Sequence, residues 1–60
     1  MKIQVTVSKK FGPLVPGTYT MEGARAKGFI TLVQKLHGAE INMPTEIHNV
    51  KYGTIRISEI

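Results

Sequence analysis

The spacing of apolar residues changes along the chain, and this change limits the folds open to it. Residues 2–8 alternate between apolar and polar side chains, which is typical of a half-buried strand. Residues 22–37 instead repeat their apolar side chains about every 3.6 positions, which predicts a helix with one buried face. Alternation returns at residues 39–43 and 54–60, so the pattern predicts strands on both sides of one helix.

Prolines and glycines separate these elements. The segment KKFGPLVPG, residues 9–17, predicts a wide loop before a short alternating stretch at residues 18–21. Its apolar residues, Phe11 among them, either fold back over the core or form an exposed contact surface. Gly38 is placed to end the helix in a left-handed conformation, and Thr20 is a candidate N-cap.

The order strand, strand, helix, strand, strand predicts an α+β domain of two layers, with one helix packed on a four-stranded mixed sheet. Residues 1–60 then form a single small domain. We expect the first and last strands to pair in parallel at the centre, with the two hairpins on opposite edges. The expected core is drawn from both layers: Ile3, Val5, Val7, Tyr19, Met21, Phe29, Leu32, Val33, Leu36, Ile41, Ile55 and Ile57.

The order and lengths of the segments, over the whole chain, resemble a β-grasp. Sulfur-carrier and ubiquitin-type members end in Gly-Gly, whereas this chain ends in Ser58-Glu59-Ile60, so the resemblance does not imply their conjugation chemistry. A two-layer plait with another strand order fits the same pattern. The connection before the last strand also has room for a short extra strand around residues 47–50.

Composition excludes several classes of protein. The chain has no cysteine, which excludes disulfides and cysteine-based zinc sites and fits a cytoplasmic protein. The first residues have no apolar signal-peptide core, and apolar runs never exceed two residues, so we expect neither a signal peptide nor a membrane-spanning helix.

The pattern for catalysis or metal binding is missing. His37 and His48 are eleven positions apart, and no glutamate near them has the spacing of a metal site. Ser8 and Ser58 have no nucleophile motif around them, and no aspartate exists to orient a histidine. We therefore expect no enzymatic activity, no metal and no cofactor.

The net charge of +4 is concentrated in the first half of the chain. Residues 1–30 hold five cations against one glutamate, and residues 31–60 hold three against three. Such a basic region attracts nucleic acid or an acidic protein, although it also serves solubility. The candidate nucleic-acid contacts are Lys9, Lys10, Arg25, Lys27 and Lys35.

The glycine in the middle of the helix suggests where a partner binds. On a helical wheel Ala24, Gly28, Thr31 and Lys35 lie together, opposite the apolar arc. Glycine at this position lowers the stability of the helix by about 1 kcal/mol relative to alanine. It is either tolerated near the start of the helix, or it lets another backbone approach closely. In the second interpretation the flanking cations form a charged rim: Arg25, Lys27 and Lys35.

These features favour a non-catalytic protein-interaction module, such as a small inhibitor or adaptor, over a basic nucleic-acid-binding protein. We expect it to be cytoplasmic, to act on a larger protein and to form a dimer, and an origin in a phage or mobile element fits a chain this short. The edges of the sheet are open to strand addition by a peptide or a second copy. The sheet's outer face has no aromatic residue to stack on bases, which disfavours binding of single strands.

Overall fold

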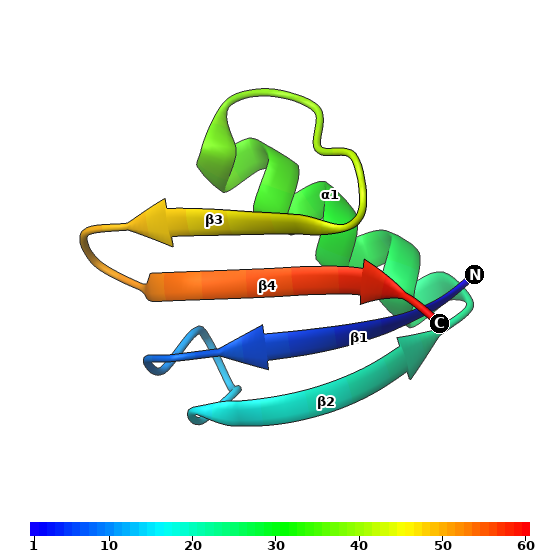
Figure 1. Ribbon diagram of the computed structural model, residues 1–60, viewed down its shortest axis with the longest axis horizontal. Helices are drawn as coiled ribbons and strands as arrows, with labels where there is room; N and C mark the ends of the chain where they lie inside the picture. Colours follow the sequence, from blue (N-terminus) through cyan, green and yellow to red (C-terminus); the bar gives the residue numbers. More distant parts are fainter.

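Five elements form two layers in the computed structural model, which describes residues 1–60 (Figure 1). Along the chain they are β1 (Lys2–Val7), β2 (Gly17–Glu22), α1 (Ala24–His37), β3 (Thr45–Asn49) and β4 (Gly53–Glu59). The helix covers one face of the four-stranded sheet and leaves the other face open. The predicted α+β class, with one helix on four strands, is confirmed.

The sheet has the order β2-β1-β4-β3, and all of its pairs are antiparallel. The two hairpins do lie on opposite edges, as expected. The prediction of a mixed sheet is wrong, because β1 and β4 pair antiparallel at the centre, with Val5 opposite Ile57. The resemblance to a β-grasp is thereby left unconfirmed.

The segment after the helix explains the antiparallel centre. The 14 residues of α1 span about 21 Å along the sheet. Residues 38–44 then run back to the end where the helix began, and seven extended residues reach about 23 Å. Because the chain returns before β3 starts, the directions of β3 and β4 are the reverse of those expected.

The strand predicted at residues 39–43 is this return segment. Ile41 and Met43 are half-buried against the core, while their neighbours are exposed, so the alternation does report burial. The segment has no strand partner; the backbone N–H of Ile41 instead donates to the Gln34 side chain at 3.4 Å. The third strand is β3, close to the alternative placement around residues 47–50, and its Ile47 is buried.

The helix begins two residues later than the pattern predicted. Gly23, with φ 67°, occupies the N-cap position without a side-chain cap, and Thr20 lies within β2, so the predicted cap is wrong. The backbone N–H of Gly23 donates to Met1 O at 2.9 Å. At the other end Gly38 adopts the predicted left-handed conformation, with φ 82°, and its N–H donates to Gln34 O.

The core differs from the predicted one at its margins. Leu32 is 53% exposed, and Tyr19, Leu36 and Ile41 are only half-buried. The buried residues come from all five elements and from the β1–β2 loop: Ile3, Val5, Val7, Phe11, Leu14, Met21, Ala26, Phe29, Val33, Ile47, Ile55 and Ile57. The loop therefore contributes to the core.

The junction of β1 and β4 requires a glycine. Ser8 N donates to Thr54 O at 3.0 Å, and Thr54 N donates to Ser8 Oγ at 2.7 Å. Gly53, just before this pair, has φ 71°, and a β-carbon on it would collide with Ser8 Oγ. Both the backbone conformation and the space around it thus favour glycine.

We expect Gly53→Ala to lower the free energy of unfolding by more than Gly12→Ala does. Each substitution places a β-carbon in the left-handed region, at a cost of about 1–2 kcal/mol, but only Gly53 adds a collision. Urea denaturation followed by circular dichroism measures both variants. Equal losses would contradict the close packing of Gly53 against Ser8.

Candidate binding surface

The β1–β2 loop, residues 8–16, folds back over one end of the core. Phe11 and Leu14 face each other in a two-residue hairpin, with backbone hydrogen bonds of 2.9 and 3.0 Å in the two directions. Gly12 holds the first central position with φ 60°, where such turns favour glycine. Phe11 and Leu14 are buried, whereas Val15 is 59% exposed, so the loop both covers the core and presents apolar surface.

Phe11 joins the loop to two other parts of the molecule. Its ring packs edge-on against Phe29 of α1, with centroids 5.8 Å apart, and against Tyr52 of the β3–β4 turn, with centroids 4.9 Å apart. Such pairs each contribute about 0.5–1.5 kcal/mol beyond the area they bury. The loop is therefore held at a fixed distance from the helix.

An open groove of about 420 Å³ lies between this loop and α1, and we call it the loop–helix groove. Most of its lining is apolar: Phe11, Pro13, Leu14, Met21, Phe29, Leu32 and Tyr52. Arg25 and Gly28 also line it from the helix. Its volume is within the range of about 300–1,000 Å³ that ligand sites occupy.

Gly28 and Leu32 are exposed on the part of α1 that lines the groove. A β-carbon at Gly28 would meet no atom within 4 Å, so the protein's own packing does not require glycine there. Leu32 was expected in the core. It lies instead on the groove wall, because β2 is the last strand on that side and no further strand covers it.

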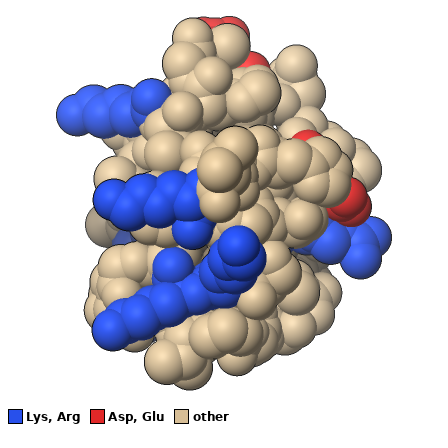
Figure 2. All heavy atoms as spheres, turned by 90° about the vertical axis from the view of Figure 1, so that its left-hand side faces the viewer, with Lys and Arg blue, Asp and Glu red and all other residues tan.

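The two elements that wall the groove carry positive charge only. The loop and the helix hold five of the eight cations and no carboxylate: Lys9, Lys10, Arg25, Lys27 and Lys35. The four glutamates lie elsewhere: Glu22, Glu40, Glu46 and Glu59. Figure 2 shows cationic side chains spread over the end of the molecule that holds the loop and the β3–β4 turn, with carboxylates only toward the margins of the view.

The residues predicted to bind a partner are not all brought together. Ala24, Gly28, Thr31 and Lys35 are exposed on α1, but only Gly28 and its neighbour Arg25 line the groove. Thr31 points its hydroxyl back to the helix, donating to Lys27 O at 3.0 Å. The sequence-based reasoning missed the groove itself, which forms between the loop and α1, with Met21 of β2 and Tyr52 also lining it.

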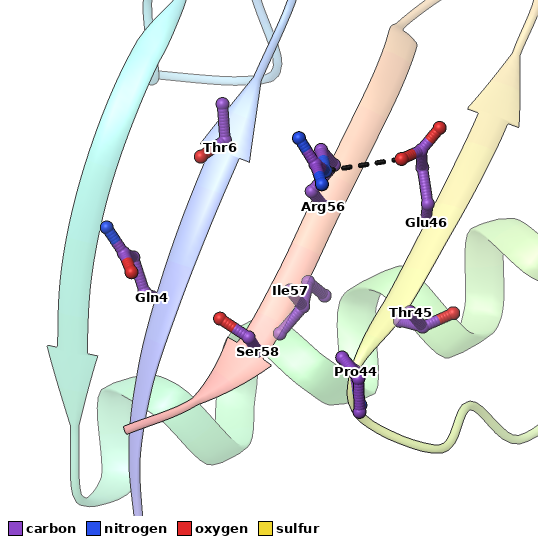
Figure 3. Close-up of a pocket in the computed structure, with 8 residues that line it drawn as sticks. All are labelled: Gln4, Thr6, Pro44, Thr45, Glu46, Arg56, Ile57 and Ser58. Carbon is purple, nitrogen blue, oxygen red and sulfur yellow. Dashed lines mark ion pairs between the residues drawn. The ribbon is translucent and has the colours of Figure 1, made fainter.

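The open face of the sheet has a second, polar hollow of about 450 Å³ (Figure 3). Gln4, Thr6 and Ser58 point into it from β1 and β4. Beside them Arg56 Nε lies 3.2 Å from Glu46 Oε2, in an ion pair across β3 and β4. On this face a cation is thus paired with a carboxylate, whereas the loop and the helix beside the groove hold no carboxylate to pair with their cations.

A row of contacts extends this ion pair along the β3–β4 hairpin. Glu46 Oε1 is 3.1 Å from His48 Nε2, and His48 Nδ1 is 3.1 Å from Thr54 Oγ1. Hydroxyl, imidazole and carboxylate thus occur in the order that a nucleophile and its base require. However, 71% of the His48 side chain is exposed to solvent. We assign the row to pairing of β3 with β4.

The two histidines lie far apart in the fold. His37 ends α1, whereas His48 is on the open face, so the sheet lies between them. No group of three histidine or carboxylate side chains lies close enough together to hold a metal ion.

We expect Gly28→Ala to raise the free energy of unfolding by about 0.5–1 kcal/mol, because alanine is the better helix former and its β-carbon has open space. The same exchange at Gly38, where φ is 82°, should lower it. Urea denaturation compares the two. A loss of stability in Gly28→Ala would mean that the fold itself requires glycine at this position.

Comparison of the chain with family models, curated proteins and solved structures finds no match. The single helix is too short to be a membrane span. The site therefore has to be interpreted from its own geometry and charge.

Proposed function

We propose that this chain is a non-catalytic protein-interaction module that binds a larger protein through the loop–helix groove. The composition of the groove and of the elements beside it carries the proposal. An apolar floor with Arg25 as its one charged lining residue lies between two elements that hold five cations and no carboxylate. Apolar contacts at the centre with charges around them are the usual arrangement of a protein interface. The charges favour an acidic partner, because complementary potentials steer association.

Gly28 supports this function because it weakens the helix although the packing of the protein does not require glycine at this position. Glycine at this position lowers the free energy of unfolding by about 1 kcal/mol, which is a large loss for a domain this small. We therefore expect the glycine to serve binding at the surface. The missing side chain keeps the groove open beside Leu32. A module with such a surface acts by occupying or recruiting its partner, as an inhibitor or an adaptor does.

The second candidate function is nucleic-acid binding at the basic end of the molecule. Lys9 and Lys10 lie in the loop, and Lys51 lies in the β3–β4 turn. Figure 2 shows cationic side chains spread over this end of the molecule. Stacking of bases would need free aromatic faces. The rings of Phe11 and Phe29 instead pack on each other, so this candidate stays second.

Affinity capture with a groove variant and a matched control tests the proposal. Gly28→Gln places a neutral side chain at the groove wall and improves helix propensity, whereas Thr31→Gln places the same side chain one turn away, outside the groove. The immobilised proteins are incubated with extract of the source cells, with and without nuclease treatment, and recovered proteins are quantified by mass spectrometry. Gly28→Gln should reduce recovery of the partner by about fivefold or more, as overpacking an interface does.

The control decides how the result is interpreted. A protein recovered by the native chain and by Thr31→Gln, but depleted by Gly28→Gln, supports the proposal. Equal recovery by both variants overturns it. Recovery that disappears after nuclease treatment transfers the assignment to nucleic acid.

A further inference from the structure

Two connections at one end of the sheet carry exposed apolar side chains. The β1–β2 loop and the β3–β4 turn, residues 50–52, lie side by side there, and we call this the lysine end (Figure 1). Val50 of the turn is 99% exposed, the highest value among the exposed large apolar residues, and Val15 of the loop is 59% exposed. Neither valine lines the loop–helix groove, so the lysine end is a separate surface.

The same two connections hold lysines and no carboxylate. Lys9 and Lys10 lie in the loop, and Lys51 lies in the turn. The carboxylate nearest to the turn along the chain is Glu46, which is paired with Arg56 on the open face. Figure 2 looks onto this end and shows cationic side chains spread over it, with carboxylates only toward the margins. The two connections therefore combine exposed apolar side chains with uncompensated positive charge.

Contacts within the chain hold the turn that presents Val50. Asn49 Oδ1 accepts hydrogen bonds from Lys51 N at 2.8 Å and from Tyr52 N at 3.0 Å. The Tyr52 ring packs against Phe11 of the loop, which ties the two connections together. Val50 takes no part in this packing, because nearly all of its surface is in solvent. Turn positions favour small or polar residues, so the fold does not explain a valine at this tip.

This combination of side chains distinguishes between anionic occupants. Nucleic acid offers phosphates to the lysines, but its bases stack on aromatic rings and not on valine. A protein would have to provide a shaped pocket for each protruding valine. A lipid surface offers anionic headgroups above a fluid apolar layer, which accommodates lysines and protruding valines together without a matched shape.

We propose that the lysine end docks on an anionic lipid surface. Val50 and Val15 enter the apolar layer, and the headgroups contact Lys9, Lys10 and Lys51. Each lysine near such a surface strengthens binding about fivefold. Binding through so few side chains is reversible. Because the groove is a separate surface, this docking does not depend on the proposed function.

Vesicle binding of matched valine and isoleucine variants tests the proposal. The probe is a vesicle of phosphatidylcholine with about 40% phosphatidylserine, and pure phosphatidylcholine is the uncharged reference. Val50→Ser removes the apolar tip, whereas Ile60→Ser removes an exposed apolar side chain at the opposite end of the molecule (Figure 1). In co-sedimentation, Val50→Ser should lower the partition coefficient about tenfold, and Ile60→Ser should leave it unchanged.

Lysine variants test the electrostatic part of the binding. Lys10→Gln combined with Lys51→Gln should lower the partition coefficient about twentyfold. Lys2→Gln combined with Lys27→Gln removes the same charge from β1 and α1, outside the lysine end. This control should lower the coefficient by less than about threefold, because salt screens charges far from the headgroups.

Tryptophan fluorescence reports which end enters the lipid. The chain has no tryptophan, so Val50→Trp and Ile60→Trp each introduce a single fluorophore. On the charged vesicles the emission of Val50→Trp should shift to shorter wavelength, because its indole leaves water for the membrane interface. The emission of Ile60→Trp should not shift.

Three results would overturn the proposal: no preference for charged vesicles, equal binding by Val50→Ser and Ile60→Ser, or an emission shift in Ile60→Trp alone. Tighter binding of duplex DNA than of charged vesicles at equal phosphate concentration, without an effect of Val50→Ser, would assign the lysine end to nucleic acid instead. Capture of a protein partner through Gly28 is measured separately, so the two proposals fail independently.

Discussion

Phe11 lies between Phe29 of α1 and Tyr52 of the β3–β4 turn, and the shape of the binding surface depends on this contact. A domain of this length has few side chains to bury, so a loop that supplies two core residues is a large part of its packing. Holding Phe11 in the core also fixes Leu14 through the tight hairpin at Gly12. The same contact that closes the core therefore sets one wall of the groove.

Side-chain periodicity located most of the elements, because it reports which side chains are buried. It identified the first strand, the helix and the left-handed Gly38 at its end. It could not show what each segment pairs with. Ile41 and Met43 alternate as in a strand but belong to an unpaired return segment, and the direction of that segment made the sheet antiparallel. Local patterns contain no information on such long-range pairing.

The candidate site was predictable only where it depends on the helix alone. Gly28 and Arg25 stood out because glycine in mid-helix weakens it and because the cations cluster in the first half of the chain. Leu32 was assigned to the core by its helical phase, and only the position of β2 at the sheet edge leaves it exposed. The groove arises from the approach of the loop to the helix, which is a tertiary contact between Phe11 and Phe29.

The antiparallel pairing of β1 with β4 has a consequence for how the chain folds. Ile3 lies opposite Glu59, so the central ladder joins opposite ends of the sequence. Pairings of such long range are slow to form, since a large loop must close before they contribute. As the chain leaves the ribosome, β1 has only β2 as a neighbour until the last strand emerges. One side of β1 then has no strand partner, and the central β1–β4 pairing forms only after β4 has been synthesised.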